Sequence, residues 1–273
     1  MPPASRTSAV ALLDPQVNPA GPASARNSGV IHAGFYYKPG SLKARACVAG
    51  RRMLYAYCAE RGIPHRKCGK IVVAADESQI AALEKLKASG EANGVENTRM
   101  ISAAEAHAME PEVACVAALH SPETGIVDVH HYTLALLGDA EQNGAALALQ
   151  SPVTGGEAAN GGFILDVGGA EPSRIACRTL INAAGLGAQP LARTLRGLDP
   201  ASVPPQVFAK GNYFSLSGRQ PFQRLVYPVP VMGSLGLHAC CDMSGRVRFG
   251  PDIEWVDRID YAVDPARVTL FED

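Results

Sequence analysis

The chain has 273 residues, of which 47% are hydrophobic and 19% are charged, and its formal net charge is -1. This composition is that of a globular protein with one large domain or two interleaved ones, and the near-zero charge argues against nucleic acid or an anionic membrane surface as the main partner. No apolar run is long enough to span a bilayer, and the run over residues 9–13 is too short for the core of a signal peptide, so we expect a cytoplasmic protein.

The seven cysteines are an odd number and show no Cys-x-x-Cys spacing. They predict neither a disulfide framework nor a zinc site, and we expect most of them to be small core residues. His130 and His131 are neighbours, and on a strand they would point to opposite faces, so they do not predict a shared metal ion. We therefore predict no metal.

In chain order, residues 8–13 predict a short buried strand that ends at Asp14, and residues 15–22 predict a loop. Residues 24–37 (SARNSGVIHAGFYY) are polar, glycine-containing and without a regular period, which predicts a loop. Its glycines would let the backbone approach a flat ligand closely, and its polar side chains would hydrogen-bond to that ligand. The alternative is a polar surface loop without a ligand.

The middle of the chain alternates helical and extended patterns. Residues 40–61 predict a helix capped by Ser41 and closed by Gly62, with apolar residues such as Leu42 and Met53 on one face. Ser102 and Glu105 form a capping-box pattern that opens a short helix ending at residues 110–111. The other expected elements are a strand over 70–74, an amphipathic helix over 77–89, an extended segment over 95–101, a strand over 116–120, a turn over 121–125 and a helix over 131–143.

Three strands are predicted over residues 145–152, 162–167 and 175–183, with no more than a hairpin in the loop-rich tract 155–169. The third strand would run through small residues and the spacing Gly185-x-Gly187 into a helix over residues 190–195. Such a turn could place a phosphate at the helix N-terminus, although the third glycine of a dinucleotide-binding fingerprint is missing. The alternative is a turn in which the glycines serve only the backbone geometry.

The last part of the chain is rich in predicted strands, over residues 206–216, 225–229, 235–241 and 247–250. These strands carry cationic, imidazole and phenolic side chains, which suit the binding of a small carboxylate. The residues concerned are Lys210, Tyr213, Tyr227, His238, Arg246 and Arg248. The alternative is a solvated sheet face that carries such residues without a ligand.

Several of these segments together resemble a known family. The matching segments are residues 26–37 (RNSGVIHAGFYY), 39–45, 121–128 (SPETGIVD), 181–185, 210–214 (KGNYF), 227–230 and 247–251. They are collinear, and from residue 10 onward the chain resembles the L-2-hydroxyglutarate dehydrogenase/oxidase branch of the FAD-dependent D-amino-acid-oxidase-like superfamily.

The resemblance implies an α/β (mixed α+β) fold of two interleaved domains. A Rossmann-like FAD-binding domain would comprise residues 1–62 and 126–200, and a substrate domain on a mixed or antiparallel sheet would comprise residues 63–125 and 201–273.

The resemblance also implies FAD as the cofactor and a role for each matching residue. At the adenosine end of the cofactor, Asp14 would bind the ribose and Val153 would meet the adenine through its backbone. Arg26, Asn27 and Ser28 would lie along the pyrophosphate and flavin, and His32 would lie beside the isoalloxazine. The residues that would flank the cofactor are Ala183, Ala184, Gly185 and Leu186. On the substrate side the candidates are Tyr213, Tyr227, His238 and Arg248, with either His32 or His238 as the catalytic base.

The implied reaction is hydride transfer from C2 of a small 2-hydroxy acid, such as L-2-hydroxyglutarate, to flavin N5. The electron acceptor stays open between a quinone, oxygen and another protein, and so does peripheral contact with the inner membrane. Two other hypotheses are an amino-acid or amine oxidase of the same superfamily and an inactive fragment.

The chain departs from the family pattern at both ends. No strand followed by Gly-x-Gly-x-x-Gly precedes Asp14, and the C-terminus falls inside the expected substrate domain, without its closing strand and helix. We therefore expect a family member truncated at both ends that binds FAD weakly or not at all, because the glycine-rich turn would supply most of the N–H donors to the pyrophosphate.

Overall fold

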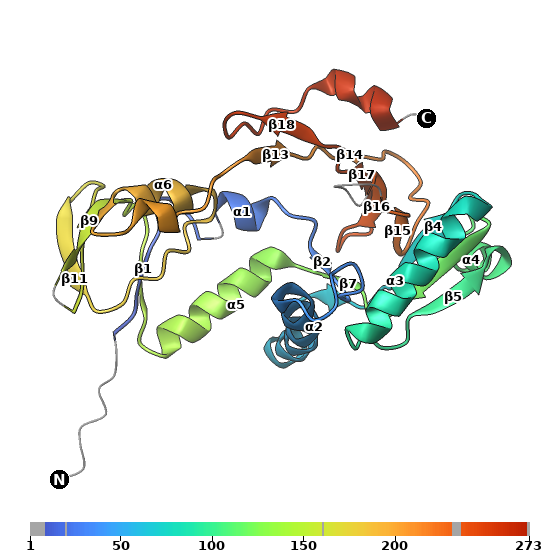
Figure 1. Cartoon of the computed structure of the whole chain (residues 1–273), viewed down its shortest axis with the longest axis horizontal. Helices are drawn as coiled ribbons and strands as arrows, with labels where there is room; N and C mark the ends of the chain where they lie inside the picture. The colour runs from blue at the N-terminus through green and yellow to red at the C-terminus, as the bar shows by residue number, and fades with distance from the viewer. Residues whose placement is uncertain (1–8, 20, 160, 231–235, 272–273) are drawn as a thin grey trace, which may run out of the picture. The chain divides into compact units, whose positions relative to one another are not determined.

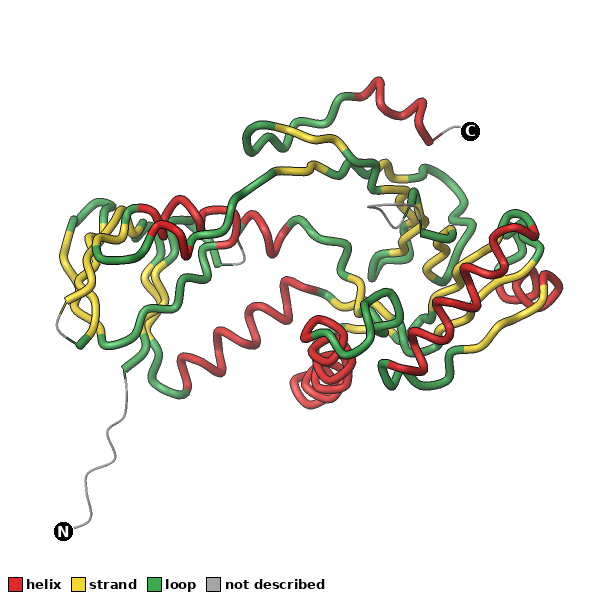
Figure 2. Tube along the Cα trace, in the orientation of Figure 1, coloured by secondary structure: helices red, strands yellow, loops and turns green. Residues whose placement is uncertain are grey.

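The computed structural model describes residues 9–19, 21–159, 161–230 and 236–271, and the chain forms two compact units (Figure 1). Unit 1 comprises Met1–Asn27 and Val129–Gln206, and unit 2 comprises Ser28–Asp128 and Val207–Asp273. The mixed α/β class is confirmed, because the described chain contains both helices and strands in each unit (Figure 2). Residues 28–62, which the sequence assigns to the FAD-binding domain, belong to unit 2 in their contacts; the functional domain division itself remains a prediction.

Unit 1 contains two small sheets. Its elements are β1 (Ala11–Leu13), α1 (Pro22–Ala25), α5 (Val129–Gln142), β8 (Ala146–Ala148), β9 (Val153–Ala159), β10 (Gly162–Val167), β11 (Ser173–Cys177), η2 (Gly185–Gly187), α6 (Ala188–Arg193), β12 (Leu195–Arg196) and η3 (Pro200–Ser202). Strands β1 and β8 are parallel, and the second sheet has the order β11-β10-β9-β12. A small core of Leu165, Val167 and Leu195 lies under this second sheet.

Unit 2 is built on a seven-stranded sheet in the order β14-β17-β16-β15-β4-β6-β5. Its elements are β2 (Val30–Ile31), α2 (Leu42–Arg61), β3 (His65–Arg66), β4 (Lys70–Ala74), η1 (Glu77–Gln79), α3 (Ile80–Ala92), β5 (Arg99–Ser102), α4 (Ala103–Met109), β6 (Ala117–Ser121), β7 (Gly125–Val127), β13 (Phe208–Lys210), β14 (Phe214–Ser215), β15 (Leu225–Pro228), β16 (His238–Cys241), β17 (Val247–Gly250), β18 (Glu254–Val256) and η4 (Pro265–Phe271). Only the central pair β15 and β4 is parallel, so the sheet is mixed.

The central pair joins the two halves of unit 2. Leu225 pairs with Lys70, and Tyr227 pairs with Val72. Helix α3 packs against β4, β5 and β6, with Leu83 fully buried in the main core (Figure 1). The main core therefore forms where a strand from residues 70–74 meets strands from residues 225–250.

The local helix signals are confirmed at residue level. The Ser41 hydroxyl accepts a hydrogen bond from Ala44 N, and Gly62 closes α2 in the left-handed conformation. Ser102 and Glu105 form the capping box at the start of α4. Among the described residues, no helix combines the length and apolar character that crossing a membrane requires.

The buried face of α2 differs from the expected one. Leu42 and Met53 are 73% and 72% exposed, whereas Val48, which also belongs to the expected face, is buried together with Ala44, Arg51 and Cys58. Small side chains on this stripe allow close packing, and Arg51 is accommodated there by ion pairs.

Three expectations for unit 1 are wrong. Strand β1 is exposed or half-buried rather than buried, because β8 is its only partner within the described chain, and residue 8 lies outside the described residues. Strand β11 ends at Cys177 rather than at residue 183, and Ile181 beyond it is 83% exposed. By contrast, the hairpin allowed in the tract 155–169 is confirmed as β9–β10, with β9 covering Val153–Ala159. His130 and His131 lie on helix α5, so the argument from strand geometry does not apply to them.

Packing within unit 2 explains why glycine occupies positions 29 and 34 of the predicted ligand loop. Gly29 and Gly34 have φ of +66° and +116°, and a Cβ added to Gly34 would come within 2.8 Å of Val48 Cγ2 on α2. A Cβ on Gly29 would come within 3.1 Å of Val127 O on β7. Both glycines therefore permit close packing inside unit 2, and a close approach to a ligand is not needed to explain them.

We expect Gly34→Ala to lower the free energy of unfolding by about 3 kcal/mol, since left-handed strain and overpacking against Val48 act together. Gly40→Ala is the matched control, because Gly40 has φ of +77° and nothing within 4 Å of the added Cβ, and it should cost about 1 kcal/mol. Urea unfolding of both variants measures the difference. Equal losses would mean that the loop yields to relieve the contact with Val48.

Candidate functional site

One face of the unit 2 sheet carries polar side chains from four adjacent strands. Lys70 opens β4, Tyr227 lies on β15, His238 opens β16 and Arg248 lies on β17. The registers Lys70↔Leu225, Val226↔Ala239 and Cys240↔Arg248 place these four side chains on the same face, because side chains alternate along each strand. The sheet order thus brings together residues that are up to 178 positions apart in the chain.

The aromatic rings of this face stack in sequence. The Tyr227 and His238 rings are stacked, with centroids 3.7 Å apart and planes inclined by 15°. The Tyr213 ring meets the edge of His238 at 6.3 Å, and the Arg248 guanidinium lies over Tyr213 at 5.4 Å. All four predicted substrate-side residues therefore form one connected group: Tyr213, Tyr227, His238 and Arg248.

His32 and Tyr36 from the loop 28–37 complete this group. Lys70 Nζ lies 3.5 Å from the Tyr227 centroid and 5.1 Å from that of Tyr36, whose ring meets His32 edge-on at 6.5 Å. We call this group the unit 2 cluster; its members are His32, Tyr36, Lys70, Tyr213, Tyr227, His238 and Arg248.

Several buried polar atoms of the unit 2 cluster have no hydrogen-bond partner within the described part of the chain. They are His32 Nδ1, Tyr36 Oη, Lys70 Nζ and Arg248 Nε. Buried polar groups are normally paired, so a gathering of four unpaired ones is typical of a site where a polar ligand completes the hydrogen bonds. Three of the four are donors or cations, which favours a ligand rich in acceptor oxygens or nitrogens.

Burial shifts the ionisation of the unit 2 cluster. Burial, then the charges of Lys70, His238 and Lys43, lowers the pKa of His32 to about 3. Burial and the Lys70 cation lower the pKa of His238 to about 4, against the Gly236 carbonyl, which raises it. Burial lowers the pKa of Lys70 to about 7, and it raises the pKa of Tyr213 and Tyr227 above the ordinary range. At neutral pH both imidazoles are therefore neutral and can accept a proton.

The tautomer of His238 follows from one hydrogen bond. Its Nδ1 lies 2.8 Å from the Gly236 carbonyl oxygen, which can only accept. Nδ1 must carry the proton, so the lone pair of the neutral ring is on Nε2. Among the described residues, no such contact to Nδ1 defines the tautomer of His32.

Arg248 also ties the loop to the sheet. One of its terminal nitrogens donates to the Ser28 carbonyl oxygen at 3.2 Å. Ser28, which the resemblance places along the cofactor, is thus bonded through its backbone to a predicted substrate-side residue.

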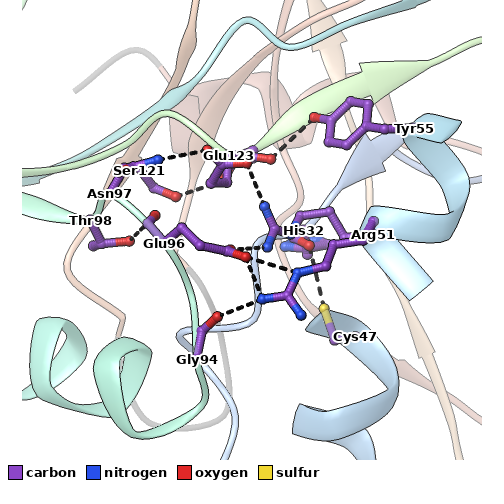
Figure 3. A network of polar contacts seen from close by, with 12 residues as sticks. His32, Cys47, Arg51, Tyr55, Gly94, Glu96, Asn97, Thr98, Ser121 and Glu123 are labelled. Carbon is purple, nitrogen blue, oxygen red and sulfur yellow. Dashed lines mark hydrogen bonds and ion pairs between the residues drawn. The ribbon is translucent and has the colours of Figure 1, made fainter. Parts of the chain in front are cut away.

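A network of charged residues supports the loop from the side of α2 (Figure 3). Cys47 Sγ donates to the His32 carbonyl oxygen at 3.4 Å. One turn further, Arg51 pairs with Glu96 and, at 2.6 Å, with Glu123. The Tyr55 hydroxyl donates to the Glu123 carbonyl oxygen at 3.1 Å, so α2 is held to the turn 121–125 and to the segment 94–98.

Two predicted residues lie outside the unit 2 cluster. Lys210 Nζ is bound by Glu254, Asp260 and the Ala262 carbonyl oxygen on the β13–β18 side. Arg246 lies in the turn before β17 and pairs with Asp242, with its side chain 74% exposed. The expectation that both contribute to carboxylate binding with the other strand residues is therefore wrong.

The remaining predicted cofactor residues lie in unit 1. Asp14 directly follows β1; its Oδ1 accepts from Gln16 N at 2.8 Å, and its own N–H donates to Ala148 O. Arg26 and Asn27 are exposed and follow α1. Val153 opens β9. Ala183, Ala184, Gly185 and Leu186 form an exposed stretch before α6, in which Gly185 has φ of +56°.

Unit 1 also contains an open hollow of about 540 Å³, a volume within the usual range of ligand pockets. Leu13, Ala148, Gln150, Val167, Glu171 and Ile175 are among its lining residues. Some of the lining residues are close to Asp14 and Val153 in the sequence, but neither Asp14 nor Val153 lines the hollow. Within the described residues, no three His, Cys, Asp or Glu side chains gather as metal ligands, and all seven cysteines are free.

Sequence reasoning missed Lys70 and Tyr36. Lys70 opens the otherwise apolar strand K-I-V-V-A, and its parity with Val72 and Ala74 would have placed it on the core-facing side. A lysine at such a position is rarely buried without a partner, and this was the available signal. Tyr36 lies within an aromatic run and carries no separate signal.

The chain is similar to known proteins along most of its length. A family model described as FAD dependent oxidoreductase matches residues 4–273. The mitochondrial L-2-hydroxyglutarate dehydrogenase of Arabidopsis thaliana is 41% identical over 91% of this chain, and the L-2-hydroxyglutarate dehydrogenase of Escherichia coli strain K12 is 35% identical over 89% of it. The matches cover 60% and 57% of those two proteins, so the chain spans about three fifths of their length.

Solved structures resemble the fold. The FAD-bound, dithionite-reduced L-alpha-glycerophosphate oxidase of Mycoplasma pneumoniae superposes with a TM-score of 0.84 at 26% identity, over 96% of this chain and 70% of that one. The glycine oxidase of Geobacillus kaustophilus superposes with a TM-score of 0.79 at 21% identity, over 95% of this chain and 68% of that one.

Proposed function

Since the chain belongs to the family of FAD dependent oxidoreductases, we propose that it acts as a flavoenzyme that oxidises a small 2-hydroxy acid, with L-2-hydroxyglutarate as the substrate. The similarity to two L-2-hydroxyglutarate dehydrogenases supports this substrate over an amino acid. The observation that carries the proposal is the unit 2 cluster, in which a neutral imidazole acceptor and a guanidinium lie on one sheet face.

FAD would supply the hydride acceptor at its N5 atom. In unit 2 the unpaired atoms His32 Nδ1 and Arg248 Nε fit a polar, acceptor-rich ring system, and in unit 1 Asp14 and the exposed stretch 183–186 fit a nucleotide. We propose that Asp14 binds the adenosine ribose and that Val153 meets the adenine through its backbone. Arg26, Asn27 and Ser28 would lie along the pyrophosphate and flavin, His32 beside the isoalloxazine, and residues 183–186 would flank the cofactor.

We propose His238 as the group that takes the hydroxyl proton of the substrate. Its Nδ1–H is held by the Gly236 carbonyl, so its Nε2 lone pair is oriented by a backbone contact and by the Tyr227 stack. His32 is the second candidate, with a buried Nδ1 that has no partner in the described chain.

Arg248 is proposed to bind a carboxylate of the substrate. Its guanidinium lies over Tyr213 and uses one nitrogen for the Ser28 carbonyl, which holds the side chain in place and leaves its Nε unpaired. A guanidinium matches a carboxylate in geometry and charge.

We expect His238→Gln to slow substrate-dependent flavin reduction by about 10²- to 10⁴-fold, because general-base catalysis contributes that much. His32→Gln should reduce the rate less while weakening flavin binding. Stopped-flow absorbance of both variants distinguishes the two histidines; a full-rate His238→Gln enzyme would transfer the role of base to His32.

The test of the function itself is the visible spectrum of the purified chain with FAD, after removal of the excess, followed by anaerobic addition of L-2-hydroxyglutarate. A retained flavin band would contradict the weak FAD binding expected from the sequence, and such a band should bleach with this substrate and not with glycine. Arg248→Ala should raise the substrate concentration needed for bleaching, whereas Arg246→Ala, which removes an exposed cation, should not. Bleaching by glycine alone would instead support an amino-acid oxidase, and a colourless protein would contradict FAD binding by this chain.

The electron acceptor, the cytoplasmic location and peripheral membrane contact remain predictions from the sequence. Adding quinone analogues or oxygen to the reduced protein, and following reoxidation, tests the acceptor.

A further inference from the structure

Lys70 is a buried cation without an acceptor. Its side chain is fully buried at the start of β4, and Nζ has no hydrogen-bond partner among the described residues. Water screens the charge of a buried ammonium group only weakly, so this charge acts strongly on neighbouring groups.

The surroundings of Nζ are aromatic. It lies 3.5 Å from the Tyr227 ring centroid and 5.1 Å from that of Tyr36. His238 stacks on the same Tyr227 ring at 3.7 Å. One ring face cannot accommodate both groups at these heights, so the ammonium and the imidazole occupy opposite faces, separated by about 7 Å.

The titratable groups that face this arrangement are tyrosines, thiols and cations. Lys70 is faced by Tyr36, Tyr227 and the thiols Cys47, Cys68 and Cys240. His238 is faced by Tyr213, Tyr227 and Lys70, and His32 by Tyr36, Lys43, Lys70 and His238. No carboxylate of the described chain is among these groups, so nothing there neutralises the Lys70 charge.

We propose that Lys70 is a positioning residue for the proton acceptor: its ammonium acts through the Tyr227 ring and adds to burial in disfavouring the protonated form of His238, and with it that of His32. That the neutral imidazole then accepts a proton from a substrate hydroxyl rests on the proposed function, whereas the charge effect itself does not. Burial is the larger cause of the low pKa of both histidines, and Lys70 is the first charge that adds to it.

The experiment is a titration of the histidine ring carbons by NMR in the 273-residue chain without cofactor or substrate. His32→Gln and His238→Gln assign the two signals. In the wild type we expect neither signal to titrate between pH 8 and pH 5. In Lys70→Met we expect the midpoint of His238 to rise by about one pH unit and that of His32 to rise as well, as expected for a like charge at this distance.

Two controls separate charge from packing. Lys87→Met removes a half-buried cation of α3 that is paired with Glu91, and it should leave both histidine signals unchanged. Lys70→Arg keeps a cation and should keep both histidines neutral, as in the wild type. Unchanged midpoints in folded Lys70→Met, or an equal rise in Lys70→Arg, would overturn the proposal. Because the readout needs neither flavin nor substrate, its failure is distinct from failure of the proposed oxidation.

Discussion

Arg51→Ala should destabilise the chain by about 3 kcal/mol, the largest loss we expect from a single change in the charged network of Figure 3. The Arg51 side chain is 2% exposed, and it is held between Glu96 on one side and Glu123, at 2.6 Å, on the other. Removing it leaves the Glu123 carboxylate, itself only 12% exposed, with Lys67 and the amide of Asn97 as its remaining partners. A buried charge deprived of one of its two cationic partners is costly because water cannot replace that partner.

Arg52→Ala is the matched control for this prediction. Arg52 is the next residue on α2 and also binds Glu96, but its side chain is 56% exposed. Exposed pairs contribute about 0–1 kcal/mol, so this variant should unfold at nearly the wild-type urea concentration. Equal losses of stability in the two variants would contradict the prediction, because burial of Arg51 would then make no difference.

The same variant has a consequence for the site. Arg51 lies one turn after Cys47, whose thiol donates to the His32 carbonyl oxygen. Because α2 is anchored by Arg51, we expect Arg51→Ala to loosen the loop that carries His32 as well as to lower stability. Hydrogen exchange of the amides in residues 30–37 should accelerate in Arg51→Ala and stay unchanged in Arg52→Ala.

Lys70→Met, unlike Arg51→Ala, should raise the free energy of unfolding, by about 2 kcal/mol at pH 7. The pKa of Lys70 is about 7 in the folded chain, below its ordinary 10.5, because burial disfavours the ammonium. That burial costs on the order of 4 kcal/mol at neutral pH, and the two tyrosine ring faces return about 2 kcal/mol of it. Methionine fills a similar volume without a charge.

The stability difference between Lys70→Met and the wild type should depend on pH. Between pH 7 and pH 10.5 the unfolded chain binds more protons at Lys70 than the folded chain does, so the wild type gains stability as the pH rises through this window. The advantage of Lys70→Met should therefore shrink toward zero by about pH 10. Urea unfolding of both proteins at pH 7 and pH 10 measures it. A Lys70→Met protein that is less stable than the wild type at pH 7 would show that the ammonium has a favourable partner in the fold.

Local features of the sequence determined much of the fold. Ser41 and Gly62 set the ends of α2, and Ser102 with Glu105 sets the start of α4, because capping depends on residues within one turn of the chain. The strand over 70–74 was predicted with its observed bounds, since a short apolar run bounded by polar residues is itself the signal. Tyr213, Tyr227, His238, Arg248 and His32 were likewise named from residue type and resemblance.

Only the tertiary structure decided which of these residues meet. The parallel pairing of β4 with β15 places Lys70 behind Tyr227, and the hydrogen bond from Arg248 to Ser28 spans 220 positions. The same long-range order leaves Lys210 and Arg246 outside the unit 2 cluster, although their sequence pattern matches that of its members. Period and capping are encoded between near neighbours, whereas strand order and register arise from pairings between distant segments, which no local pattern specifies.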